Sequence, residues 1–271
     1  MPEPVPTALT IAGSDSGGGA GIQADLKTFQ ALGVFGMTAI TAVTVQNTKG
    51  VSGYEEIPAD AVAEQIRAVA TDIGVDAAKT GMLASAPIIH SVAETVAESQ
   101  IPNLVVDPVF VSKHGHPLLR DDAVEVLRAE ILPLAVLVTP NIPEASGLAG
   151  FPVQTPTDME RAGLAILELG PRAVLVKGGH LEEGDATDLL VTADGVQPIS
   201  AERIHTPNTH GTGCVLSAAI AGRLALGDEL VDAVRKGKLF VTEAIRAALP
   251  IGQGIGPVNP SWGLKLWGVG G

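Results

Sequence analysis

The chain has 271 residues, of which 46% are hydrophobic and 17% charged, so it can bury a large core in one α/β domain or in two smaller ones. Its formal net charge of -13 and the lack of any basic run argue against a surface for nucleic acid or anionic lipid, and no apolar run reaches the ~18 residues of a membrane-spanning helix. A single cysteine excludes an internal disulfide and a Cys-rich zinc site, and the start of the chain lacks the features of a signal peptide, which predicts a cytoplasmic protein.

The first element expected in chain order is a buried strand over 7–13, a short apolar run that ends in glycine. A Gly-rich loop, Ser14 to Gly21, follows this strand. The loop fits no nucleotide fingerprint, because Ile22 occupies the last position of a G-x-G-x-x-G pattern starting at Gly17, and the chain contains no G-x-x-x-x-G-K-[ST]. We therefore expect neither a Rossmann dinucleotide site nor a Walker loop.

The next element, a helix expected over 20–32, has a charged residue on its apolar stripe. At ~100° per residue, Asp25 lies between Leu32 and Phe29, on the side that faces the core. A carboxylate in this place needs a partner, because burying it unpaired costs several kcal/mol. Two interpretations remain open: Asp25 caps or pairs with a neighbouring loop, or it accepts a hydrogen bond from the amino group of a ligand.

Strands and helices alternate along the rest of the chain. Strands are expected over 38–46, 75–81, 104–109, 135–140 and 173–179, helices over 59–73, 85–98, 121–132, 157–169, 211–227 and 228–249, and an antiparallel hairpin over 186–192 and 196–200. Thr157 and Glu160 are interpreted as the capping box that starts the helix over 157–169. The alternation, with its short connections, predicts an α/β fold with a doubly wound, mostly parallel sheet.

The stretch from His205 to Cys214 is typical of a loop that opens a buried helix. Gly211 and Gly213 would let an anion approach the unpaired N–H groups of the first helical turn. Cys214 lies in that turn, where the pKa of a thiol is expected to fall. A phosphate site is one interpretation. The other is structural, with glycines that pack the helix against the sheet and a cysteine that acts as a small buried hydrophobic residue.

Polar residues gather at the expected carboxyl ends of the strands, where ligands bind in open parallel sheets. They are Gln46, Lys79 to Met82, Asp107, Asn141 to Glu144, and Lys177 to His180. Each has a structural explanation when taken alone: Asp107 as a turn residue, Asn141 to Glu144 as a helix cap, and Lys177 as a lysine that reaches out from a strand end. Together they supply two acids for Mg²⁺, a lysine for phosphates and a candidate base, which indicates phosphoryl transfer.

Seven sequence runs carry a family resemblance. They are AGSDSGGGAGIQADLKT (12–28), TAVTVQNTKGV (41–51), KTGML (79–83), VDPV (106–109), TPNIPEA (139–145), VKGGH (176–180) and NTHGTGCVLSAA (208–219). In order and spacing, the chain from about residue 7 to 258 resembles the hydroxymethylpyrimidine/phosphomethylpyrimidine kinases of thiamine biosynthesis, which belong to the ribokinase superfamily. The resemblance implies a ribokinase-like sheet flanked by helices on both faces, residues 1–271 as a single kinase domain, and a homodimer.

The resemblance also implies a role for individual residues. The pyrimidine site is matched by Gly13, Asp25, Gln46 and Met82, with a main-chain contact at Thr44. The ATP and phosphate site is matched by Asn141, Glu144, Lys177, Thr209, Gly211 and Gly213, and the Mg²⁺ side by Asp107 and Glu144. The resemblance implies a catalytic role for Lys177, Gly211, Thr212 and Gly213, and for Cys214, which stands where many members of the superfamily have a catalytic aspartate. Residues 110–118 match a flap, in which Ser112 stands where relatives active on pyridoxal can have a cysteine. The tail after Pro257 departs from the family pattern, so no role is assigned there.

The expected activity is ATP- and Mg²⁺-dependent phosphorylation of 4-amino-5-hydroxymethyl-2-methylpyrimidine to the monophosphate and then the diphosphate. A noncatalytic sugar or nucleotide sensor would be expected to have lost the lysine, the acids or the Gly-Thr-Gly, and a nicotinamide oxidoreductase would need the missing fingerprint. Pyridoxal or pyridoxine kinase is the alternative activity. Asp25 and Gln46 favour the aminopyrimidine, because pyridoxal has a phenolic oxygen where the amine would lie.

Overall fold

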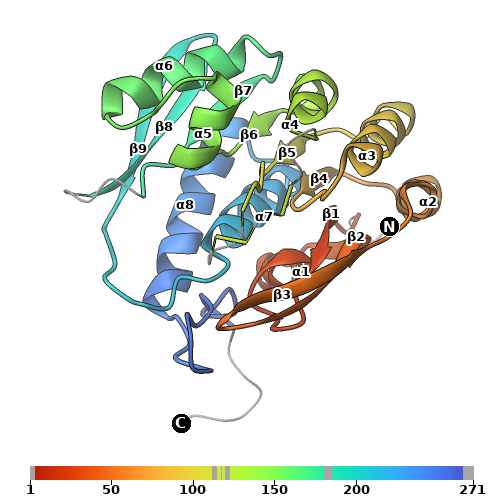
Figure 1. Ribbon diagram of the computed structural model, residues 1–271, viewed down its shortest axis with the longest axis horizontal. Helices are drawn as coiled ribbons and strands as arrows, with labels where there is room; N and C mark the ends of the chain where they lie inside the picture. Colours follow the sequence, from red (N-terminus) through yellow and green to blue (C-terminus); the bar gives the residue numbers. More distant parts are fainter. Residues whose placement is uncertain (1–3, 112–114, 117, 120–122, 180–184, 265–271) are drawn as a thin grey trace.

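The computed structural model describes residues 4–111, 115–116, 118–119, 123–179 and 185–264. Its strands form a nine-stranded sheet in the order β3-β2-β1-β4-β5-β6-β7-β8-β9, and Figure 1 shows the β3 and β9 edges at opposite ends of the molecule. The strands are β1 (Thr7–Ser14), β2 (Phe35–Asn47), β3 (Gly50–Glu56), β4 (Ala77–Thr80), β5 (Leu104–Val106), β6 (Leu137–Val138), β7 (Ala173–Val176), β8 (Ala186–Thr192) and β9 (Gly195–Ala201). The expected hairpin is therefore confirmed as β8 and β9.

The centre of the sheet is parallel, as the alternation of strands and helices predicts. Five pairs of neighbouring strands, from β2-β1 to β6-β7, are parallel. Three pairs at the edges are antiparallel: β2-β3, β7-β8 and β8-β9. The edge strand β3 was not predicted, because its sequence, GVSGYEE, has two glycines and no alternation of apolar and polar residues.

Helices cover both faces of the sheet, and each face has its own core. Alternate residues of β1 point to different cores, since Leu9 and Ile11 belong to one and Ala8 to the other. The first core is covered by α2 (Ala59–Asp72), α3 (Ala86–Glu98), α5 (Ile142–Ala149) and α6 (Pro156–Leu167), and the second by α1 (Gly21–Leu32), α7 (Thr212–Ala225) and α8 (Leu230–Arg246) (Figure 1). None of the helices in the described part of the chain has the length and apolar character needed to cross a membrane.

Two local predictions need correction. The capping box of helix α6 lies two residues earlier than expected, because it is formed by Thr155 and Asp158 and not by Thr157 and Glu160. Pro156 follows the cap at the first helical position, where its missing N–H costs nothing. The helix expected over 121–132 is irregular: α4 (Ala123–Val126) leads into one wide turn over Leu127–Ile131 and a tight turn over Leu132–Leu134.

Candidate active site

A cavity of about 630 Å³ opens at the carboxyl ends of the parallel strands. It brings together residues that are far apart in the sequence, because the ends of β1, β2, β4, β5, β6 and β7 meet along one edge of the sheet. The predicted site residues that line it are Gly13, Thr44, Gln46, Met82, Asp107, Asn141, Glu144, Lys177, Thr209, Gly211, Thr212, Gly213 and Cys214. Asp25 is the one predicted site residue that does not line the cavity.

A lysine and two carboxylates form the charged centre of the cavity. Nζ of Lys177 lies 2.9 Å from Oδ1 of Asp107 and 4.0 Å from Oε2 of Glu144. Burial, and then the nearby Asp107 carboxylate, raise the pKa of Glu144 to about 7 although Lys177 opposes the rise. Burial would likewise raise the pKa of Asp107, but the ammonium groups of Lys177 and Lys79 hold it below the ordinary value. The centre thus has more negative than positive charge, which favours a bound cation.

Helix α5 fixes one of these carboxylates. Its N-cap, Asn141, accepts a hydrogen bond from the backbone N–H of Glu144, and the Glu144 carboxylate accepts one from the backbone N–H of Asn141 at 2.8 Å. The sequence left open whether these residues cap a helix or bind a ligand. They form the cap, and the same capping box holds Glu144 at the cavity, 3% exposed.

The N-terminus of α7 points its first turn at this charged centre. Gly211 is the N-cap, with φ of 81°, and a Cβ there would lie 1.8 Å from the carbonyl oxygen of Gly19. Only glycine fits this close approach. A Cβ on Gly213 would lie 3.4 Å from Nζ of Lys177, so the start of α7 is adjacent to the lysine. No side chain caps the helix. The N–H of Thr212 donates to the carbonyl of Thr209, and the following N–H groups of the turn can meet an anion such as a phosphate.

Cys214 lies in the first turn of α7 and lines the cavity, as expected, but the prediction for its acidity is wrong. Burial raises the pKa of the thiol to about 11, despite the nearby Lys79 ammonium and a backbone hydrogen bond from Gly21. Removal of water disfavours the thiolate more than these groups favour it. At neutral pH and without ligands, Cys214 is therefore a thiol.

The opposite side of the cavity is formed by the ends of β1, β2 and β4. Thr44 and Gln46 point to the same face of β2, and the hydroxyl of Thr44 donates to the carbonyl of Ser14 at 2.8 Å. A Cβ on Gly13 would lie 3.2 Å from the sulfur of Met82, so glycine leaves space for the methionine side chain. This side combines one amide with an apolar wall, which suits a small flat ring.

Asp25 has a structural partner where the sequence suggested a ligand contact. Its Oδ2 accepts hydrogen bonds from Nζ of Lys79 at 2.9 Å and from the hydroxyl of Thr10 at 2.6 Å, and both Asp25 and Lys79 are fully buried. Burial alone would lower the pKa of Lys79, but Asp25, with Cys214 and Asp107, raises it above the ordinary value. Asp25 thus has a partner within the protein, a strand lysine and not a loop, while its Oδ1 has no hydrogen-bond partner. A ligand contact of Asp25 stays a prediction.

Asp25→Asn is expected to destabilise the protein by about 3–5 kcal/mol, because it leaves the Lys79 ammonium buried without its carboxylate. Guanidinium unfolding of wild type and variant measures this. The double variant Asp25→Leu/Lys79→Met, which removes both charges, should recover most of the loss. If the single variant loses less than about 1 kcal/mol, the pair does not stabilise the fold.

Several cavity residues were not among the predicted site residues. Lys79 and Lys238 are buried lysines, the second paired with Asp188 at 2.7 Å, and Asp15 pairs with His210 at 2.9 Å. One signal was available for Lys79, since a lysine inside a buried strand and an aspartate on an apolar helix stripe each need a partner of opposite charge. Asp15 and His210 are separated by 195 residues, and no local pattern joins them.

The predicted flap over 110–118 is described only in part. Val111, Gly115 and Leu118 line the cavity. Ser112, at which pyridoxal-active relatives can have a cysteine, lies outside the described residues.

An uncapped helix N-terminus beside a lysine and two carboxylates, on a mostly parallel sheet, is the arrangement expected of a kinase that acts on a small molecule. The family model described as phosphomethylpyrimidine kinase matches residues 15–259. The chain belongs to this family, and the ribokinase-like fold and kinase activity expected from the sequence are confirmed.

Relatives and solved structures agree with this membership. The hydroxymethylpyrimidine/phosphomethylpyrimidine kinase of Streptomyces coelicolor is 52% identical over 259 residues, which cover 96% of this chain and 96% of that protein. The phosphomethylpyrimidine kinase from Clostridium difficile has a TM-score of 0.78 and 47% identity, over 88% of this chain and 99% of the other. An ADP complex of Bacillus subtilis pyridoxal kinase has a TM-score of 0.89 and 42% identity, over 95% and 98% of the two chains.

Proposed function

We propose that this kinase phosphorylates 4-amino-5-hydroxymethyl-2-methylpyrimidine and then converts the monophosphate to the diphosphate, in thiamine biosynthesis. The observation that carries the proposal is the division of one cavity into a ring side, with Gln46 and Met82, and a phosphate side, with Lys177 and the start of α7. The name of the Streptomyces coelicolor relative, 52% identical, contains both activities.

The residues of the cavity suggest how the reaction proceeds. Lys177 and the first N–H groups of α7 hold the transferred phosphoryl group of ATP and stabilise the charge that develops on it. In the first reaction, the hydroxymethyl oxygen forms a bond to the γ-phosphorus, the bond to ADP breaks, and the hydroxyl proton passes to the thiolate form of Cys214. In the second, an oxygen of the bound monophosphate forms a bond to the γ-phosphorus of a new molecule of ATP, and the bond to ADP breaks.

We further propose that Mg²⁺ enters with ATP on the side of Asp107 and Glu144. Mg²⁺ in phosphoryl-transfer sites is held by one or two carboxylates together with phosphate oxygens and water. The donor set fits this pattern, because two buried carboxylates lie near one lysine. The ion would neutralise charge on the phosphates.

The purified protein should form the pyrimidine monophosphate and then the diphosphate from ATP, with both steps lost when EDTA removes the divalent cation. Mass spectrometry of the products under excess ATP measures this. If the reaction stops at the monophosphate, the second half of the proposal is wrong. If no pyrimidine product forms at all, the function is wrong.

Pyridoxal phosphorylation is the second candidate, and a specific observation favours it: the Bacillus subtilis pyridoxal kinase has a TM-score of 0.89 with this chain. The kinetic panel should therefore include pyridoxal. We expect kcat/KM for the pyrimidine to exceed that for pyridoxal by at least ~10-fold, which corresponds to about 1.4 kcal/mol. Comparable values would make pyridoxal an equal substrate.

Three further features belong to the proposal. We propose that residues 1–271 act as one kinase domain and that segment 110–118 covers the bound substrates. The presence of Val111 and Leu118 in the cavity lining supports the second point.

The exposed side chains of Val43 and Val45 support a homodimer, since they are 46% and 65% exposed on the face of β2 away from the cavity. Sedimentation equilibrium tests this proposal. The need for ATP supports a location in the cytoplasm.

A further inference from the structure

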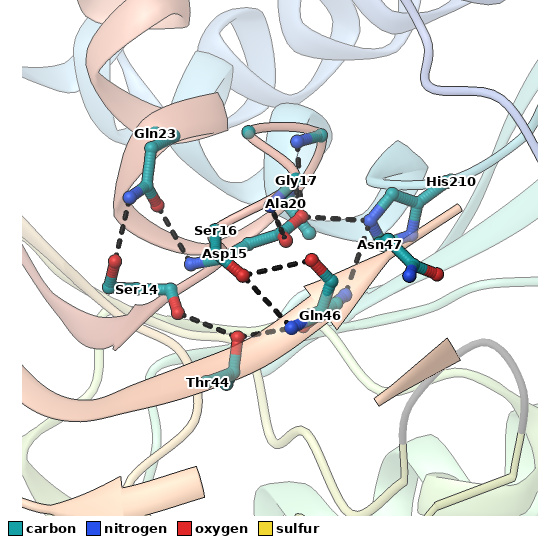
Figure 2. A network of polar contacts seen from close by, with 12 residues as sticks. Ser14, Asp15, Ser16, Gly17, Ala20, Gln23, Thr44, Gln46, Asn47 and His210 are labelled. Carbon is teal, nitrogen blue, oxygen red and sulfur yellow. Dashed lines mark hydrogen bonds and ion pairs between the residues drawn. The ribbon is translucent and has the colours of Figure 1, made fainter. Parts of the chain in front are cut away.

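A chain of polar contacts runs from the Gly-rich loop after β1 to the ring side of the cavity (Figure 2). Oδ2 of Asp15 lies 2.9 Å from Nε2 of His210. The same imidazole nitrogen lies 3.3 Å from the amide nitrogen of Gln46, and the amide oxygen of Gln46 lies 3.2 Å from the hydroxyl of Thr44. Gln46 and Thr44 both line the cavity, so this chain ends at the surface that a substrate ring would contact.

Asp15 is held as a carboxylate that can only accept hydrogen bonds. It is 3% exposed, and its two oxygens accept from the backbone N–H groups of Gly17, Gly19 and Ala20 at 2.7–3.0 Å. Burial would raise the pKa of Asp15, but the hydrogen bond and charge of His210, with the Gly17 and Ala20 amides, lower it below the ordinary value. The atom of His210 that faces this carboxylate must therefore carry a proton.

The imidazole has little freedom to turn away. The backbone N–H of His210 donates to the carbonyl of Gly256, and its own carbonyl accepts from the N–H of Val258, both at 3.0 Å. A Cβ on Gly19 would lie 2.5 Å from the imidazole Cδ2, so the ring packs directly against the glycine backbone. The ring therefore presents the same edge to Asp15 and to Gln46.

A protonated Nε2 decides which end of the Gln46 amide faces it. Nε2–H of His210 repels an amide NH₂ group, whereas an amide oxygen can share its proton with Asp15. The oxygen and nitrogen of an amide exchange places by a half-turn that moves no other heavy atom, and their assignment follows from the hydrogen-bond partners. The imidazole therefore selects the orientation in which Oε1 of Gln46 faces His210.

The contact between the Gln46 amide and Thr44 independently supports the same orientation of the amide. Thr44 has one hydroxyl proton, and the Ser14 carbonyl, 2.8 Å away, can only accept it. The Thr44 oxygen must then accept from Gln46, which requires the amide nitrogen on this side. One orientation thus satisfies His210 and Thr44 together, with Oε1 toward His210 and the NH₂ group toward Thr44.

We propose that Asp15 and His210 are positioning residues that fix the orientation of the Gln46 amide, and that this orientation selects the pyrimidine edge. The proposal rests on the function proposed above. His210 uses one lone pair of the Gln46 amide oxygen, and Thr44 uses one hydrogen of its NH₂ group. The second lone pair and the second hydrogen remain for a ligand, so Gln46 offers one acceptor and one donor whose positions are fixed. A 4-aminopyrimidine has the complementary order, a ring-nitrogen acceptor beside an amino donor. The 4-oxo analogue has the reverse order, a ring N–H beside a carbonyl.

The test is the ratio of kcat/KM for the 4-amino pyrimidine to kcat/KM for its 4-oxo analogue, which has the same 5-hydroxymethyl acceptor. In the wild type we expect a ratio of at least ~30, because a fixed amide leaves the wrong edge mispaired. His210→Leu removes the donor that holds Oε1, so the amide can turn to suit either ligand, and the ratio should fall at least ~5-fold. The loss should appear mainly in KM for the pyrimidine, with KM for ATP unchanged.

Two further variants separate positioning from a general structural effect. His210→Gln has an amide NH₂ of similar reach that can donate to both Asp15 and Gln46, so it should restore much of the ratio. The matched control is His90→Leu, which changes an exposed histidine of α3 that contacts Glu130 and should leave the ratio unchanged. A loop that is merely loosened would weaken both ligands equally and keep the ratio.

A measurement on the wild type completes the test without relying on a variant that folds. ¹⁵N NMR of the imidazole should report Nε2 of His210 as protonated at neutral pH. An unprotonated Nε2, or an unchanged ratio in folded His210→Leu, would overturn the proposal even when the pyrimidine is a good substrate. Failure of the wild type to phosphorylate the pyrimidine would instead contradict the proposed function.

Discussion

Replacing Cys214 by alanine is expected to lower kcat by roughly 10² to 10⁴, the range in which a positioned acid or base contributes. Cys214 lies in the first turn of α7, beside the phosphate side of the cavity, where it can take the proton of the hydroxymethyl group. Steady-state kinetics with the pyrimidine and ATP measures the effect. If the alanine variant retains activity within about twofold of wild type, the cysteine only packs, and the backbone N–H groups of α7 carry the catalysis.

The pKa of Cys214, raised to about 11 by burial, adds a pH dependence. Because the pKa is raised, the thiolate is scarce at neutral pH and its fraction increases about tenfold per pH unit up to that value. The wild-type rate should therefore rise with pH between 8 and 10. Cys214→Asp should retain more activity than Cys214→Ala and should lose this rise, since a carboxyl group is already ionised there. Identical profiles in wild type and Cys214→Asp would argue against a thiolate base.

Lys177→Met is expected to lower kcat by about 10² or more and to leave binding of the pyrimidine nearly intact. Lys177 holds the phosphate side through contacts with Asp107 and Glu144, and a phosphate clamp acts mainly in the transition state. Kinetics gives kcat, and calorimetric titration with the pyrimidine gives its affinity. An equal loss in both would refute the assignment of Lys177 to the phosphate.

The Lys177 variant needs a control for folding, because it leaves two buried carboxylates without their ammonium group. Circular dichroism and a thermal melt show whether the variant is folded. Lys236→Met is a matched substitution at a half-exposed lysine of α8 that pairs with Asp228 outside the cavity. Its kcat should stay within about twofold of wild type.

The sequence by itself determined the fold class and the edge of the sheet that carries the site. Apolar strand runs and helical periods are local patterns, and their alternation permits few topologies. Once the sheet is parallel, the carboxyl ends of its strands must meet, so Gln46, Asp107 and Lys177 could be assigned to one cavity without knowing any distance. The glycines at the start of α7 were also visible as a local feature, although the sequence left open whether they form an anion site or pack the helix against the sheet.

Only the tertiary structure decided how the polar residues are paired and what burial does to them. Asp25 pairs with Lys79, 54 residues away, and Asp15 pairs with His210, 195 residues away. The acidity of Cys214 depended on the amount of water excluded around the thiol, which a motif does not encode. The hydrophobic periodicity that predicts helices and strands depends on neighbouring residues, whereas the pairing of charged side chains and their removal from water depend on which distant segments pack together.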